Sequence, residues 1–226
     1  MADFLSRTFP NTLDLWPDLL KATGETFIMV SISFLITVAI GFPLGVLLMA
    51  TKNKSLFYNN TLYKGVSAII DVLRSTPTVI LITAISPLTK ILTGSKIGIR
   101  GAIVPLVFAS APFLARQIEA ALVKTDPGII RAAKSMGNSP LKIITSVILP
   151  ESLSSLIMAL TLTFVSLINF SAIAGTVGGG GLGDFALRYG YQQFKWDIMI
   201  ITIVFLVVFV IIIQSAGKHL SHKLMK

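Results

Sequence analysis

The chain of 226 residues has no cysteine and few charged residues. The absence of cysteine excludes disulfides, thiolate metal sites and a cysteine nucleophile. Charged residues make up only 13% of the chain, about half the share usual in a soluble domain, whereas 54% of the residues are hydrophobic. This balance excludes a soluble enzyme and indicates an integral membrane protein.

Signatures of nucleotide, metal and nucleophilic chemistry are also missing. The pattern GxxxxGK[ST] does not occur, so the chain has no phosphate-binding loop with which to hydrolyse ATP alone. Gly178, Gly180 and Gly183 satisfy GxGxxG, but a long apolar run precedes them instead of a strand, so we predict a tight turn or close packing. His219 and His222 are fewer ligands than a metal site needs, and no serine–histidine–acid set is apparent. We therefore predict no catalytic site, no metal site and no cofactor on this chain.

Long charge-free runs predict that the chain crosses the membrane five times. Residues 26–51, 152–183 and 198–217 carry no charge, and each run is long enough for a spanning helix of about 20 residues. The shorter cores at 75–89 and 101–115 can reach full thickness because the flanking lysine and arginine side chains extend to the interface. We predict an all-α membrane domain over 26–217, with spans at about 26–50, 75–93, 97–117, 152–174 and 197–217.

The segment before the second predicted span contains an acid and a base. Asp71 and Arg74 lie one helical turn apart and can pair. Arg74-Ser-Thr-Pro77 is typical of an elbow, with Pro77 in the first turn of the helix that follows. Residues 62–74 then lie along the membrane surface, although an early start of the second span is a simpler alternative. The sequence slightly favours the elbow.

The distribution of lysine and arginine predicts the orientation. With five spans, the loop at 118–150 and the C-terminus share a side that carries eleven basic residues, against seven on the other side. We therefore expect this loop and the basic tail 218–226 on the cytoplasmic side of a bacterial inner membrane. The segment 1–25, which lacks the pattern of a signal peptide, is expected outside. The net charge of +9 is attributed to loops that face anionic lipid, not to nucleic-acid binding.

The polar stretch at 119–150, EAALVKTDPGIIRAAKSMGNSPLKIITSVILP, separates two apolar runs. Its charged residues would each cost several kcal/mol in hydrocarbon, so the stretch lies outside the bilayer. Pro127-Gly128 predicts a turn, and the apolar spacing that follows predicts a short helix. Gly137-Asn138 predicts a left-handed cap, and Ser139-Pro140 predicts the start of the next helix.

The short helix has a surface suited to a partner. Its exposed apolar residues lie beside Arg131 and Lys134, as in helices that occupy a groove of another protein. An amphipathic helix that rests on lipid has the same composition. The residues alone leave both readings open.

The whole stretch resembles the EAA loop of bacterial ABC importer permeases. The resemblance rests on Glu119-Ala-Ala121, on Gly137 sixteen residues after Ala121, and on Ile148-Leu-Pro150. In that family the loop forms a coupling helix that docks on a separate ATPase subunit, which by position is 128–136 here. The implied docking residues are Glu119, Ala120, Ala121, Gly128, Ile129, Ile130, Arg131, Ala132, Ala133, Lys134, Met136 and Gly137.

From about Glu25 to the C-terminus, the chain resembles the permease subunits of methionine-uptake ABC importers. The motifs are Gly41-Phe-Pro-Leu-Gly-Val-Leu-Leu48, Arg74-Ser-Thr-Pro77, Ala102-Ile-Val-Pro-Leu106, Ala111-Pro-Phe113, Ile148-Leu-Pro-Glu151, Gly178-Gly-Gly-Gly-Leu-Gly183 and Tyr189-Gly-Tyr191. The resemblance implies the five-helix fold of a type I importer permease and a homodimer of permeases. It also implies two cytoplasmic ATPase subunits that bind ATP and Mg, and an external binding protein or lipoprotein. Departures at Asn169-Phe170 and Asp184-Phe185 concern the exact ligand.

The fourth predicted span is the candidate wall of a translocation pathway. Ser155, Ala159, Thr163 and Ser166 recur at spacings of 4, 4 and 3, which places them on one helical face. Small residues also allow close helix packing, which we favour for the first two of these positions. The predicted pathway residues are Met158, Thr163, Ser166, Asn169 and Ser171.

The expected function is therefore that of the permease subunit of an ATP-driven importer, with methionine as its cargo. Alternating access would be coupled to the ATPase through the loop. Another amino acid, a dipeptide or an osmolyte is an alternative cargo. The fourth and fifth spans contain no buried charge, which disfavours an ion-coupled carrier, and the EAA loop disfavours a passive channel.

Overall fold

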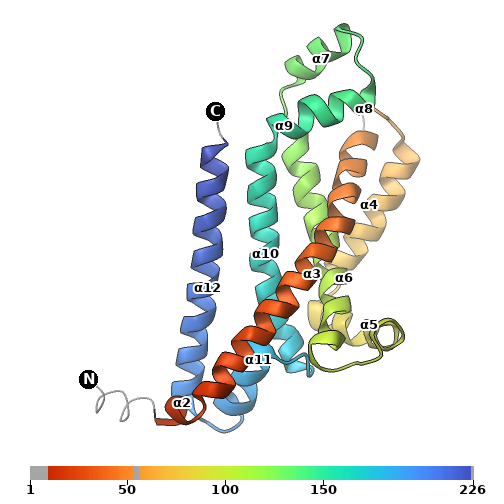
Figure 1. Cartoon of the computed structure of the whole chain (residues 1–226). Coiled ribbons are helices and arrows are strands. Elements are labelled where there is room, and N and C mark those ends of the chain that lie inside the picture. The colour runs from red at the N-terminus through yellow and green to blue at the C-terminus, as the bar shows by residue number, and fades with distance from the viewer. Residues whose placement is uncertain (1–9, 53–55, 225–226) are drawn as a thin grey trace. The chain divides into compact units, whose positions relative to one another are not determined.

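The computed structural model describes residues 10–52 and 56–224, and every regular element in these two ranges is a helix (Figure 1). The predicted all-α class is therefore confirmed. The long helices are α3 (Trp16–Thr51), α6 (Gly98–Val123), α10 (Leu153–Thr176) and α12 (Trp196–Lys223). The shorter ones are α2 (Pro10–Asp14), α4 (Asn60–Ser75), α5 (Thr78–Thr93), α7 (Pro127–Ser135), α8 (Pro140–Ile143), η1 (Ile144–Ile148), α9 (Leu149–Glu151), α11 (Gly181–Phe185) and η2 (Ala186–Tyr191).

The long helices match the length that a membrane requires. Among the described residues, α3, α6, α10 and α12 are each long and apolar enough to cross, and α4 with α5 adds a fifth span if the pair counts as one. Three helices extend well beyond the predicted spans, because α3 already begins at Trp16, α6 continues to Val123 and α12 continues to Lys223. Residues 1–9 of the predicted outer segment and 225–226 of the basic tail lie outside the described residues.

The predicted elbow is present between α4 and α5. The first helix ends at Ser75 and the second begins at Thr78, with a bend of 110° across the break. Proline disfavours the α conformation in the residue before it, which favours a break at Thr76. Pro77 is the residue that precedes α5, so it lies just before the first turn instead of inside it. The alternative of one continuous second helix is wrong.

The described helices pack into two compact units. The described residues of unit 1 lie in the ranges 10–35, 76–109 and 164–213. Its core includes Met29, Leu106 and Leu167, which are fully buried. The rings of Phe34 and Phe164 pack edge to face beside this core, with centroids 5.0 Å apart. Interlocked apolar side chains of this kind stabilise helix packing through dispersion contacts.

A glycine turn in unit 1 links α10 to α11. Gly180 and Gly181 have φ angles of 78° and 76°, in the left-handed region that favours glycine. The carboxylate of Glu25 accepts a hydrogen bond from Gly181 N at 3.0 Å, and the Thr26 hydroxyl accepts one from Leu182 N at 2.8 Å. The tight turn predicted for the GxGxxG match is therefore confirmed, and it follows a helix instead of a strand.

Unit 2 contains the polar loop. Its described residues lie in the ranges 36–52, 56–75, 110–163 and 214–224. Leu114 and Ile118 of α6 are fully buried there and belong to one cluster with Ile143 and Ile148, which lie in the loop itself. The loop is thus packed onto the helix that precedes it and has a fixed base.

Candidate functional site: the polar loop and its base

The short helix of the loop, α7, has a defined beginning. Asp126 precedes it, and the Oδ1 atom of Asp126 accepts a hydrogen bond from Gly128 N at 2.6 Å. Pro127 occupies the first helical position, where its missing N–H costs nothing. The sequence predicted a turn at Pro127-Gly128 before the helix, but these residues already form its first turn.

The end of α7 matches the prediction. Gly137 has a φ of 76°, and its N–H donates to the carbonyl of Lys134 at 3.0 Å. The side chain of Asn138 donates to the carbonyl of Ala133 at 3.1 Å, so the last carbonyls of the helix are satisfied. Ser139 then caps α8, and Pro140 opens it, as predicted. The chain direction thus changes within Gly137 to Ser139.

The two sides of α7 differ in chemistry. Ala133 is buried, and Ile130 packs against the core cluster of unit 2. Arg131 and Lys134 are exposed, and Met136, which follows α7, has 79% of its surface exposed. A hollow of about 470 Å³ lies beside the helix and is lined by Met49, Lys52, Leu56, Leu122, Val123, Thr125, Pro127, Ile130, Arg131, Lys134 and Ile148.

Glu119, near the end of α6, is held inside the chain. It is only 5% exposed. Its Oε1 accepts hydrogen bonds from Lys52 Nζ and from the Tyr63 hydroxyl, both at 3.1 Å, and its Oε2 accepts one from Arg116 Nη1 at 2.7 Å. A buried carboxylate needs such partners to offset its loss of hydration. In the isolated chain, Glu119 therefore anchors the base of the loop.

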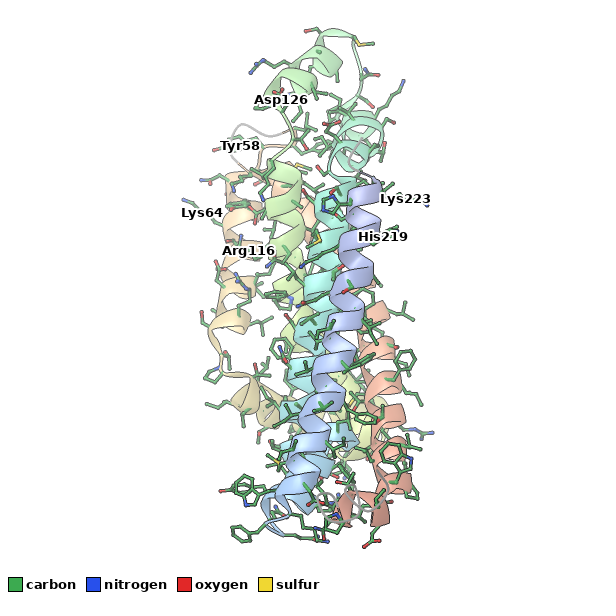
Figure 2. All side chains as sticks on the ribbon, turned by 90° about the vertical axis from the view of Figure 1, so that its left-hand side faces the viewer. Tyr58, Lys64, Arg116, Asp126, His219 and Lys223 are labelled. Carbon is green, nitrogen blue, oxygen red and sulfur yellow. The ribbon has the colours of Figure 1, made fainter. Side chains whose placement is uncertain are left out.

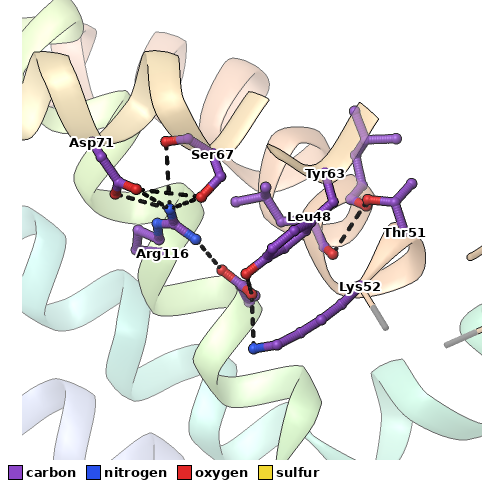
Figure 3. A network of polar contacts seen from close by, with 9 residues as sticks. Leu48, Thr51, Lys52, Tyr63, Ser67, Asp71 and Arg116 are labelled. Atoms are coloured by element: carbon purple, nitrogen blue, oxygen red, sulfur yellow. Dashed lines mark hydrogen bonds and ion pairs between the residues drawn. The ribbon is translucent and has the colours of Figure 1, made fainter. Parts of the chain in front are cut away.

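Arg116 extends this network to α4. Its Nη2 donates to both carboxylate oxygens of Asp71 at 2.8 Å and also to the hydroxyl of Ser67. The guanidinium thus joins Glu119 on its own helix to Asp71 on α4. Figure 3 shows its contacts with Asp71 and Ser67. Asp71 therefore pairs with Arg116, 45 positions further along the chain, and not with Arg74 as predicted.

The two stems of the loop are joined by a pair of buried hydroxyls. The Thr125 hydroxyl lies 2.9 Å from that of Ser152, and it also donates to the carbonyl of Leu122 at 3.0 Å. The return stem contains the π-helical turn η1, which comes directly before the short helix that contains Pro150. A wide turn accommodates a proline, whose ring would clash with the carbonyl four residues earlier in a regular α-helix.

The predicted docking residues divide into two groups. The exposed group comprises Ala120, Ile129, Arg131, Ala132, Lys134, Met136 and Gly137, whereas Gly128 and Ile130 are partly buried and Glu119, Ala121 and Ala133 are buried. Sequence reasoning missed Lys52, Tyr63 and Ser67 of the network, which no local spacing connects to Glu119. The one available signal was that Arg116 precedes Glu119 by three residues, a spacing that allows pairing on a helix.

The predicted pathway residues on α10 have different surroundings. Thr163 and Ser171 are buried, and their hydroxyls donate to the carbonyls of Ala159 and Ile168 on the same helix. Asn169 is exposed, while Ser166 and Met158 are partly exposed. Met158 borders a hollow in unit 2 that is described below. Within one chain, Asn169 is therefore the polar side chain of this set that is most available to a ligand.

The fold and loop define a helical, multi-pass membrane protein with an ordered polar loop. The family described as "binding-protein-dependent transport system inner membrane component" matches residues 41–226. Over 205 residues, the chain is 46% identical to the probable D-methionine transport system permease protein MetI of Vibrio cholerae, and the match covers 91% of each protein. It is 42% identical over 216 residues to the methionine import system permease protein MetP of Bacillus subtilis, covering 95% of this chain and 96% of the relative.

A solved structure extends this similarity to the fold. A chain of the inward-facing MetNI methionine ABC transporter superposes with a TM-score of 0.92 at 38% identity, covering 94% of this chain and 99% of that chain. The protein therefore belongs to the binding-protein-dependent transport system inner membrane component family. The predicted family and fold are confirmed, and the chain is a multi-pass inner-membrane permease.

Proposed function

We propose that this chain is the permease subunit of an ATP-driven methionine importer. A homodimer would form the pathway, two cytoplasmic ATPase subunits would bind ATP and Mg, and an external binding protein or lipoprotein would deliver the amino acid. Methionine is supported by relatives named for methionine transport that are 46% and 42% identical to this chain over 205 and 216 matched residues. Another amino acid, a dipeptide or an osmolyte is the second candidate cargo.

The observation that carries the proposal is the exposed side of α7. The short helix exposes Arg131 and Lys134, exposed Met136 follows it directly, and the buried carboxylate of Glu119 lies at the base of the loop. An isolated helix of nine residues is unstable in water, so the caps and the packing of Ala133 keep it formed before any partner arrives. Such an ordered helix suits a groove of an ATPase better than a fluid lipid surface.

The proposed orientation places α7 and the end of α12 in the cytoplasm. Figure 2 shows Asp126, at the base of α7, beyond Lys64 and Lys223 along the helices of unit 2. The exposed cations of this unit then face the side on which positively charged loops are enriched. The N-terminal end of α3 would lie outside the cell.

In the proposed cycle, movement of the ATPases is transmitted through the loop. ATP binding closes the two ATPases, and the paired α7 helices move with them. The network of Lys52, Arg116 and Glu119 connects that movement to α3, α4 and α6. The pathway then opens alternately outward and inward, and Asn169 is the candidate polar contact for a zwitterionic substrate.

Two substitutions of equally exposed residues test the docking assignment. Met136 is 79% exposed and Phe194 is 77% exposed, but Phe194 belongs to unit 1, whereas the loop belongs to unit 2. We expect Met136→Asp to reduce co-purification of the ATPase and to abolish uptake of labelled methionine by the reconstituted complex. Phe194→Asp is expected to keep the ATPase bound. Equal co-purification by both variants contradicts docking through α7, whereas uptake of another amino acid by the intact complex contradicts the methionine assignment alone.

A further inference from the structure

A second hollow in unit 2 brings together two lysines and a histidine. It has a volume of about 640 Å³ and lies among the end of α6, the first half of α10 and the end of α12. Lys124, Lys218 and His222 line it, all three side chains are exposed, and no aspartate or glutamate is among the lining residues. The ion pairs of the described residues involve none of the three. The hollow therefore offers positive charge to a ligand from outside the chain.

Polarity falls along one wall of the hollow. On α10, Ser154 and Ser155 lie near the cations, and Met158 and Leu162 follow one and two helical turns further into the apolar run. Eight residues of helix correspond to about 12 Å at 1.5 Å per residue. A ligand that matches this wall has an anionic group at one end and an apolar tail at the other.

The walls of the hollow are held together independently of a ligand. The hydroxyls of Ser154 and Ser221 lie 2.7 Å apart, and the Ser221 hydroxyl also reaches the carbonyl of Ser154 at 3.2 Å. Four residues earlier on α12, Gly217 abuts the side chain of Thr161, so the two helices run in close contact. The space between the cations is thus fixed in advance, which lowers the entropic cost of binding.

The cations lie where the apolar part of the bundle ends. The charge-free run of α12 stops at Gly217, and Lys218, His219, His222 and Lys223 follow it. Figure 2 shows His219 and Lys223 at this end of unit 2. Lysines at the end of a membrane helix lie at the level of lipid headgroups. Basic pockets between membrane helices at that level are recognised sites for anionic headgroups.

We propose that this hollow binds an anionic phospholipid. Lys124 and Lys218 would contact the phosphate, His222 would add a hydrogen-bond donor, and an acyl chain would lie along Met158 and Leu162. The inference does not depend on the proposed function, because it requires only that this end of unit 2 meets headgroups. It assigns Met158 to a lipid contact, whereas the sequence predicted a place in the pathway. A substrate bound in the same hollow is the competing outcome.

Native mass spectrometry of the purified full chain tests the proposal. The probes are phosphatidylglycerol, phosphatidylcholine with identical acyl chains, and inorganic phosphate. We expect phosphatidylglycerol to bind in preference to phosphatidylcholine. The double variant Lys124→Gln, Lys218→Gln should weaken its binding by on the order of tenfold or more, since each lysine near the surface contributes about a factor of five. Lys64→Gln with Lys142→Gln removes two exposed cations elsewhere in unit 2 and should leave binding unchanged.

Competition experiments distinguish a bound phospholipid from bound free phosphate or bound substrate. If inorganic phosphate displaces phosphatidylglycerol at equal concentration, the apolar wall plays no part in binding and the proposal fails. If methionine displaces it, the hollow belongs to the translocation pathway and the proposal also fails. Equal loss in the two double variants also overturns it. Lys124→Arg with Lys218→Arg keeps both charges and should retain the lipid, which guards against a loss that comes only from misfolding.

Discussion

Arg116 and Glu119 lie one helical turn apart on α6, with Nη1 and Oε2 separated by 2.7 Å, at the point where the membrane helix meets the polar loop. The same guanidinium reaches Asp71 on α4, and the same carboxylate reaches Lys52 at the end of α3. Three segments distant in sequence are therefore tied to one position directly below α7. This arrangement connects the base of the loop to the end of α3, to α4 and to α6.

Glu119→Ala should destabilise the chain. The substitution leaves Arg116 and Lys52 without the carboxylate that pairs them, in a place where the Glu119 side chain is only 6% exposed. Because Lys52 is 43% exposed and Arg116 keeps its pairing with Asp71, removal of the buried carboxylate is expected to cost about 1–3 kcal/mol. The change in stability is measured as a shift in the thermal unfolding temperature in detergent, with the loss of monodisperse protein as the readout. Asp184→Asn breaks an ion pair with the exposed Arg188 and should change stability by less than about 1 kcal/mol; equal shifts would contradict a special role for the network.

Gly137→Ala should loosen the end of α7. The φ of 76° at this position is unfavourable for a residue with a Cβ atom, at a cost of roughly 1–2 kcal/mol. No atom lies within 4 Å of the added methyl group, so the effect isolates backbone strain from a steric clash. Gly65→Ala, inside α4 and equally open, is the control and should stabilise the chain slightly. If both variants unfold at the same temperature, Gly137 is not required as a helix cap.

Asp126→Ala should increase the opening of α7. The carboxylate accepts the amide hydrogen of Gly128 at 2.6 Å, and loss of such a cap typically costs about 1 kcal/mol. Amide hydrogen exchange within Pro127–Ser135 is expected to accelerate about fivefold, while exchange in the buried part of α6 stays unchanged. Asp126→Asn keeps a capping oxygen and should exchange nearly as slowly as the original chain. Unchanged protection in Asp126→Ala would show that tertiary packing alone holds the helix.

The sequence predicted local features of the loop well because each depends on a few neighbouring residues. Gly137, Ser139 and Pro140 act through backbone conformation and capping within one turn, and the structure shows all three in the predicted roles. The start of α3 at Trp16 was missed because the charged residues before position 26 were taken to mark the beginning of the helix as well as the beginning of the membrane span. Charged residues such as Asp18 and Lys21 are compatible with a helix outside hydrocarbon.

The polar network was beyond local prediction for a different reason. Asp71 has Arg74 one turn away, and the spacing rule favoured that pair. The tertiary structure instead brings Arg116 to Asp71, with an additional hydrogen bond to Ser67. Similarly, Lys52 and Glu119 are separated by 67 positions and meet only because α3 packs beside α6 in unit 2. Such pairs follow from helix packing, which a single sequence does not specify.

Asn169→Leu should impair transport without affecting assembly. Asn169 is exposed on α10, so its amide can contact a polar substrate group, whereas leucine of similar size cannot. We expect methionine uptake by the reconstituted complex to fall at least tenfold while the ATPase still co-purifies. Thr163→Val is the matched control, because the Thr163 hydroxyl is fully buried and bonded to the carbonyl of Ala159 on its own helix. Loss of uptake in Thr163→Val with normal uptake in Asn169→Leu would move the pathway to the buried side of α10.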